Sequence, residues 1–186
     1  MYNLFKYLEK KEGRLISIPN LIKLYSKYDL NINLVDEVKD LINKGYDPSN
    51  NDNEAIIYAS ENGHLDVVKL LLEDDGVDPS DQNNLAIIDA SRNGHLEVVK
   101  LLLIDDRVDP SDVNNQAIRY ASFIGHLEVV KLLLMDNRVD PSDLNNWAIR
   151  YAYIYGHLEV VKSLLMDDRV KDFLSEKDYL KYKSII

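Results

Sequence analysis

The ten residues "GHLEVVKLLL" occur at 94–103 and again, unchanged, at 125–134. Close variants occupy 63–72 ("GHLDVVKLLL") and 156–165 ("GHLEVVKSLL"), so successive copies lie 31 residues apart. Prolines and histidines keep the same interval: Pro48, Pro79, Pro110 and Pro141, and His64, His95, His126 and His157. A fixed period of this length is the signature of a repeat architecture in which each unit is one supersecondary element.

Each unit reads as a turn, a helix, a second turn and a second helix. The turn "DPSD" combines Pro, which fixes φ, with Asp and Ser, which favour turns. We expect the asparagine of each copy (Asn53, Asn84, Asn115 and Asn146) to cap the first helix and the glycine before each histidine to end it. The second helix, "HLEVVKLLL", is apolar around most of its circumference. Such a helix must be covered on several sides, so neighbouring copies are predicted to stack.

The period divides the chain into six segments. We predict an N-terminal helical cap with a degenerate repeat at 1–45, repeats at 46–76, 77–107, 108–138 and 139–169, and a C-terminal half-repeat cap at 170–186. The N-terminal cap contains two apolar stretches, "NLFKYLEK" and "PNLIKLYSKY". Near the C-terminus, Ser175 and Asp178 have the spacing of a capping box.

Composition argues against several classes of function. The 186 residues carry a net charge of −10, which disfavours binding to nucleic acid, and they include no cysteine. The N-terminus does not resemble a secretory signal, and no apolar run is long enough to cross a membrane. We therefore expect a soluble, intracellular chain.

The repeated histidines do not predict a metal site. Stacked helices lie roughly 8–10 Å apart, whereas the ligands of one zinc ion lie at roughly 2 Å. We expect each histidine to fix the turn before its second helix. No nucleophile elbow, phosphate-binding glycine loop or zinc motif is present. The sequence thus predicts no catalytic, cofactor or metal site, and a protein that is not an enzyme.

The "GHLEVVKLLL" core, the alanine-containing helix before it and the near-33 period resemble ankyrin repeats over residues 46–169. The pattern "VDPSD-NN-AIR-A---GHLEVVKLLL" further resembles the ankyrin repeats of giant DNA viruses of amoebae. The resemblance implies an all-α solenoid that binds a protein partner through its first helices, which line a concave face. Because the loop between repeats is two residues shorter than in the family, we expect shortened fingers in place of β-hairpins.

Comparison of the four first helices within this chain locates the candidate binding surface. One face carries the same small and aliphatic residues in every copy, whereas the opposite face varies, with Ile57, Ile88 and Asp89 among its members. We predict an aromatic–arginine patch centred on the third and fourth repeats, because Trp, Tyr and Arg often dominate binding energy. The predicted partner-binding residues are Glu61, Arg92, Arg119, Phe123, Ile124, Trp147, Arg150, Tyr151, Ile154 and Tyr155.

Two alternatives stay open at this point. Tyr120 and Tyr151 either face a partner or pack between repeats. Asp89, at the equivalent position, indicates that this position is not fully closed in every repeat. For the whole protein we expect a monomer that binds a protein partner of unknown identity. The resemblance favours a viral adaptor acting on host proteins in the host cytoplasm. The alternative is a virion structural or self-assembling component.

Overall fold

The computed structural model describes residues 17–28 and 34–185. This part of the chain contains twelve helices and no strand, which confirms the predicted all-α fold without β-hairpin fingers. None of the described helices is both long and apolar enough to span a bilayer. The predicted stretch "NLFKYLEK" lies outside the described residues. The helices are α2 (Ile18–Lys27), α3 (Leu34–Asn43), α4 (Asn50–Glu61), α5 (Leu65–Leu72), α6 (Asp81–Arg92), α7 (Leu96–Ile104), α8 (Asp112–Ile124), α9 (Leu127–Leu134), α10 (Asp143–Ile154), α11 (Leu158–Met166), α12 (Asp168–Lys171) and α13 (Glu176–Lys183).

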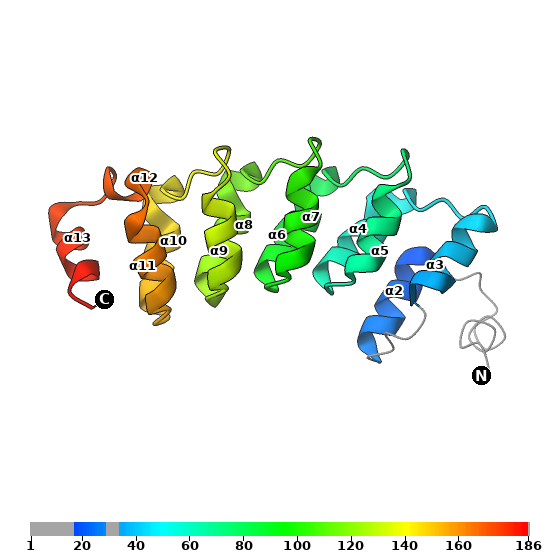
Figure 1. The fold of residues 1–186 in the computed structure, drawn as a ribbon, viewed down its shortest axis with the longest axis horizontal. Coiled ribbons are helices and arrows are strands. Elements are labelled where there is room, and N and C mark those ends of the chain that lie inside the picture. The colour runs from blue at the N-terminus through cyan, green and yellow to red at the C-terminus, as the bar shows by residue number, and fades with distance from the viewer. Residues whose placement is uncertain (1–16, 29–33, 186) are drawn as a thin grey trace.

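The helices form antiparallel pairs that stand side by side along an elongated molecule, from α2 and α3 at one end to α13 at the other (Figure 1). The first helices of neighbouring pairs (α4, α6, α8 and α10) contact one another extensively, whereas the second helices (α5, α7, α9 and α11) contact one another sparingly. A stack curves toward its more closely spaced layer. The first helices therefore form the inner layer of the stack, and the second helices form the outer layer.

The core runs without interruption through the described helix pairs. Each second helix buries the same three aliphatic residues, for example Val67, Val68 and Leu71 of α5, at 0–1% exposure. Each first helix buries two alanines and an isoleucine against them, such as Ala86, Ala90 and Ile87 of α6. Burial of one such aliphatic side chain contributes about 1.5–3 kcal/mol. This shared core explains why the same apolar letters recur every 31 residues.

The predicted capping role of the asparagines is wrong. In each repeat three consecutive residues before the first helix have positive φ, as in Asn51, Asp52 and Asn53 (φ 56°, 54° and 57°). The chain thus makes a left-handed turn before it enters the right-handed helix. No side-chain cap hydrogen bond is present at Ser49, the residue that precedes α4. Asn53 instead directs its amide to the next repeat, where it accepts from the Asp78 N–H and donates to the Asp81 carboxylate, both at 2.9 Å.

The glycine that ends each first helix adopts the predicted left-handed conformation, with φ 72° at Gly63. The His64 N–H donates to the Ala59 carbonyl at 2.9 Å, and the Gly63 N–H donates to the Ser60 carbonyl at 3.2 Å. These two hydrogen bonds form a Schellman motif. The histidine ring that follows reaches the preceding repeat. His95 Nε2 lies 2.9 Å from the Glu61 carbonyl oxygen, to which it must donate. The histidine ring therefore joins two repeats, whereas backbone hydrogen bonds close the turn before the second helix.

An aspartate–arginine pair in the loop before a repeat makes a further link between repeats. Asp105 holds Arg107 through two hydrogen bonds, at 2.9 and 2.7 Å, and Arg107 Nη1 donates to the Val77 carbonyl of the preceding loop at 2.7 Å. The hydrogen bond from Arg107 lowers the pKa of the Asp105 carboxyl. The same pair recurs as Asp136 with Arg138 and as Asp167 with Arg169.

The C-terminal cap contains a short helix, α12, and a single longer helix, α13. Ser175 Oγ accepts from the Asp178 N–H at 3.1 Å and donates to the Asp178 carboxylate at 2.7 Å, so the predicted cap forms at the start of α13. Tyr182 of α13 packs against Tyr153 of α10, with ring centroids 5.0 Å apart. The cap therefore covers part of the last repeat.

Candidate partner-binding surface

Four aromatic side chains from α8, α10 and the residue after α10 form one cluster, which we call the aromatic cluster: Phe123, Trp147, Tyr151 and Tyr155. Trp147 and Tyr151 stack with ring centroids 4.0 Å apart and an interplanar angle of 19°. Phe123 meets the edge of Tyr155 at 4.6 Å and lies 6.0 Å from Trp147. Because Phe123 comes from the repeat before the other three, the cluster bridges two repeats of the inner layer.

Two arginines lie over aromatic rings in this part of the inner layer. The Arg119 guanidinium lies over the Trp147 ring at 5.3 Å. It is held there by hydrogen bonds to the Asn114 and Val113 carbonyls of its own left-handed turn, at 2.8 and 3.1 Å. One repeat earlier, Arg92 lies 4.6 Å from the centroid of Tyr120. Cation–π contacts of this kind contribute about 0.5–1 kcal/mol each at exposed sites.

Large apolar side chains in the cluster and next to its members in the chain are open to solvent. Tyr155 is 55% exposed, Ile154 63% and Ile124 40%. The rings are therefore pre-ordered by their mutual contacts, while the apolar edge of the patch has no covering element among the described residues. A rigid aromatic surface with an apolar edge and a guanidinium beside it can bind a partner without first ordering its own side chains.

Two predicted residues lie apart from the cluster. Arg150 is exposed and lines a pocket near the C-terminal cap. Glu61 ends α4, two repeats away, and its backbone carbonyl is occupied by His95 and by the Asn93 amide. Arg92 lies one repeat earlier, on α6. The structure brings the other seven of the ten predicted residues together around α8 and α10: Arg119, Phe123, Ile124, Trp147, Tyr151, Ile154 and Tyr155.

The variable face of the first helices is more enclosed in the early repeats than the sequence suggested. Ile57 and Ile88 are only 4% and 3% exposed, because that edge of the helix meets the neighbouring repeat. Asp89 is also buried, at 7%, so its presence is not a sign of an open position. Its Oδ1 lies 3.1 Å from Arg92 Nη1 in an ion pair. Burial raises the pKa of the Asp89 carboxyl, and the Arg92 charge only partly opposes this.

The two alternatives for Tyr120 and Tyr151 turn out to be compatible. Both tyrosines are half-buried. Tyr120 contacts Arg92 of the preceding repeat, and Tyr151 lies 6.2 Å from Phe123 of the preceding repeat, measured between ring centroids. Each therefore packs between repeats while keeping part of its ring accessible on the inner layer.

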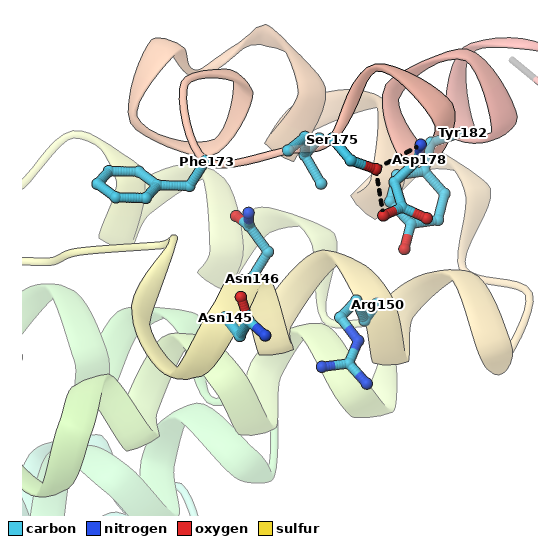
Figure 2. Close-up of a pocket in the computed structure, with 8 residues that line it drawn as sticks. Asn145, Asn146, Arg150, Phe173, Ser175, Asp178 and Tyr182 are labelled. Carbon is cyan, nitrogen blue, oxygen red and sulfur yellow. Dashed lines mark hydrogen bonds between the residues drawn. The ribbon is translucent and has the colours of Figure 1, made fainter.

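One feature of the site region was not found from the sequence. A pocket of about 450 Å³ lies between α10 and the C-terminal cap, and Figure 2 shows Asn146 on α10 directed toward the segment that carries Phe173 and Ser175. The signal was present in the repeat pattern, because Leu174 stands 31 residues after Asp143, where a further copy would have an aspartate.

Comparison with known proteins agrees with this geometry. The family model for "Ankyrin repeats (3 copies)" matches residues 28–114, and the model for "Ankyrin repeat" matches residues 115–147. A search of the curated proteins gives no match. The two matches together span well over half of the chain, from residue 28 to residue 147, and cover the stacked helices from α3 to α9. The chain belongs to the ankyrin-repeat family.

Proposed function

We propose that this protein is a non-catalytic binding module that holds a protein partner on its inner layer, at the aromatic cluster and the adjoining arginines. Ankyrin repeats are in general modules of protein–protein interaction, and this chain has the rigid inner layer that such binding needs. The proposal rests mainly on two side chains that are more than half exposed: Tyr155, which belongs to the aromatic cluster that two repeats hold in place, and its chain neighbour Ile154.

The chemistry of the patch indicates the kind of surface that would bind there. Tyr155 and Ile154 offer apolar area, and burying it supplies roughly 25 cal/mol per Å². Arg92 and Arg119 offer guanidinium groups at the side of the rings. A protein segment that presents apolar side chains next to a carboxylate would satisfy both features. Interface hot spots commonly combine these elements.

The test replaces the exposed edge of the cluster with small polar side chains. A variant with Phe123→Ala, Ile154→Ser and Tyr155→Ser is compared with the unchanged protein in affinity capture from the cells that express it. The control removes three exposed apolar side chains of the outer layer, through Ile104→Ser, Met135→Ser and Met166→Ser, which are 77%, 80% and 67% exposed.

We expect the inner-layer variant to lose a specific partner that the outer-layer variant retains, with the thermal midpoints of both close to that of the unchanged protein. If both variants capture the same proteins as the unchanged protein, the assignment of the binding surface is wrong. If only the outer-layer variant loses the partner, the binding surface lies on the second helices.

The finer expectations from the sequence stay predictions. These are a viral origin, an adaptor role in a host cytoplasm, the segment boundaries given above and a monomeric state. The rival expectation, a self-assembling or virion component, predicts that the apparent mass in light scattering rises with concentration. The binding-module proposal predicts that it stays at the mass of one chain.

A further inference from the structure

The asparagine of each internal repeat holds the turn of the next repeat through the same two hydrogen bonds. Its Oδ1 accepts from the N–H of the first aspartate of the "DPSD" turn, and its Nδ2 donates to the carboxylate of the second aspartate. For Asn84 these partners are Asp109 at 2.7 Å and Asp112 at 2.9 Å. Asn53 and Asn115 make the same pair of bonds. The structure therefore shows three examples of the kind of turn that this asparagine binds.

Asn146 has the same backbone conformation and the same burial, but neither partner. Its φ is 59° and its exposure 2%, yet its buried Oδ1 has no hydrogen-bond partner in the described part of the chain. The cap explains why. The N–H of Lys171, 31 residues after Asp140, donates to the Asp167 carbonyl next to α12, and Leu174 stands where a carboxylate would be needed.

The unpaired amide faces the pocket of about 450 Å³ between α10 and the cap. Arg150, further along α10 in Figure 2, supplies a positive charge to the lining and makes no ion pair with any described residue. The carboxylate on the opposite wall, Asp178, is engaged by the Ser175 hydroxyl at 2.7 Å. A buried amide oxygen without a hydrogen-bond partner is unfavourable, and a ligand that donates to it would remove that cost.

We propose that this pocket binds an acidic turn of a partner polypeptide, of the form Asp-x-x-Asp. Asn146 forms the same two hydrogen bonds with this turn that Asn53, Asn84 and Asn115 form with the turns inside the stack. The backbone N–H of the first aspartate pairs with Asn146 Oδ1, and the carboxylate of the second pairs with Asn146 Nδ2. Arg150 attracts the negative charge of the turn. This site is separate from the aromatic cluster and does not depend on the function proposed for it.

The chain's own first turn is a poor occupant, which argues for a different polypeptide rather than a second copy. That turn is "DPSN" at 47–50, and Asn50 stands where the internal turns have an aspartate. In an internal turn the second aspartate uses both of its carboxylate oxygens. One oxygen of Asp112 accepts from the Val113 N–H at 2.7 Å, and the other accepts from the Asn84 side-chain amide. Asn50 has a single oxygen, and it already accepts from the Asn51 N–H at 3.2 Å.

The experiment titrates the full chain with a blocked peptide that has the sequence of residues 108–113, Val-Asp-Pro-Ser-Asp-Val. The matched peptide differs only in its second aspartate, replaced by asparagine. Binding is followed by isothermal calorimetry and by the NMR shift of the Asn146 side-chain amide. We expect the first peptide to bind and to shift that amide, and the second to bind at least about tenfold more weakly, since a charged acceptor is lost.

Variants of the chain then locate the site. Asn146→Ala should weaken binding at least about tenfold, and Arg150→Gln should weaken it about threefold and reduce its dependence on salt. As a control, Asn114→Ala changes the residue before Asn115, the asparagine of another repeat that corresponds to Asn146. This variant should leave the affinity for the peptide unchanged. The inner-layer variant of the aromatic cluster should also bind the peptide normally, which separates this site from the proposed function.

Two results would overturn the proposal. One is the absence of any amide shift at about 10 mM peptide, which would mean that Asn146 is satisfied by water alone. The other is equal affinity for the two peptides. Because Arg150 is exposed, Arg150→Gln keeps the test valid even if Asn146→Ala perturbs the fold.

Discussion

At the scale of single residues, the most unusual feature is the left-handed turn before each first helix. Side chains with a Cβ pay roughly 1–2 kcal/mol for this conformation, and Asn and Asp tolerate it best. The first of the three positions is Asn51 in one repeat but Val113 and Leu144 in others, with φ 50° and 48°. A β-branched residue such as valine is therefore held there against its own preference by the surrounding turn.

Replacing Val113 with asparagine should relieve this strain. Val113 is 39% exposed, so little buried apolar area is lost. We expect Val113→Asn to raise the free energy of unfolding by about 1 kcal/mol, measured by urea denaturation. As a control, Ile104→Asn, also exposed but in a right-handed helix, should not stabilise the protein. A fall in stability for Val113→Asn would show that the valine side chain has a packing role.

Asp89 should make stability depend on pH in a defined direction. Burial raises its folded pKa above the ordinary value of 3.8, so the folded protein binds a proton that the unfolded chain has released. Its contribution is therefore fully present below pH 3.8 and is lost as pH rises through the folded pKa. We expect Asp89→Asn to be more stable than the unchanged protein at pH 7 by about 0.5–1 kcal/mol.

The matching measurement is a set of denaturation curves for both proteins from neutral to acidic pH. The advantage of Asp89→Asn should shrink as pH approaches 3.8. An advantage that grows on acidification, or a less stable variant at pH 7, would mean that the ion pair with Arg92 outweighs the cost of burial.

At the scale of elements, each helix pair is fastened to its neighbour by the same polar links. The His126 ring packs directly against Gly94. A Cβ atom added to Gly94 would lie only 2.5 Å from His126 Nδ1, which is too close for two atoms that are not bonded. Gly156 has a similar φ, 77° against 76°, but nothing within 4 Å of the same point. The two glycines therefore separate backbone strain from the contact between repeats.

Alanine at these two glycines should have unequal effects. Gly156→Ala is destabilised only by its left-handed conformation, by about 1 kcal/mol. Gly94→Ala has the same cost and must also displace His126 from the Arg92 carbonyl, 2.9 Å from its Nε2, which adds about 1–3 kcal/mol. Thermal unfolding of the two variants checks this. Equal losses would show that the histidine ring moves aside freely.

The asparagine links provide a second matched pair. Asn84→Ala leaves the Asp109 N–H and the Asp112 carboxylate without their partner, whereas Asn83→Ala, at the neighbouring exposed left-handed position, breaks no described bond between repeats. We expect Asn84→Ala to lower the free energy of unfolding by about 2–3 kcal/mol more than Asn83→Ala. Asn146→Ala should resemble Asn83→Ala. Similar losses for Asn84→Ala and Asn146→Ala would contradict the role assigned to these links.

The sequence predicted the elements better than the links between them. Periodicity indicated the helix pairs and the glycine stops because those depend on residues close together in the chain. The sequence alone predicts that Asn53 caps its own helix, although its partner Asp81 lies 28 residues ahead, because one sequence shows which residues recur but not which neighbour they contact. For the same reason the sequence predicts an open face for Ile57 and Ile88, which the structure buries, whereas the aromatic residues near Tyr155 lie together because they come from adjacent repeats.

At the scale of the whole molecule, the links and the continuous core make the inner layer a fixed surface. Each repeat contacts only its neighbours, so the shape of the surface follows from the geometry of one interface repeated along the stack. Side chains on the inner layer differ from repeat to repeat without disturbing that interface. The aromatic cluster lies where two such repeats meet, which is why it depends on the stack being intact.

The central claim is that the inner layer at α8 and α10 binds a protein. The most direct measurement places a photo-crosslinking amino acid at Tyr155 of the inner layer and, in a separate protein, at Met135 of the outer layer. We predict a defined covalent adduct from position 155 that disappears when Phe123→Ala is added, and none from position 135. An adduct from position 135 without one from position 155 would contradict the account.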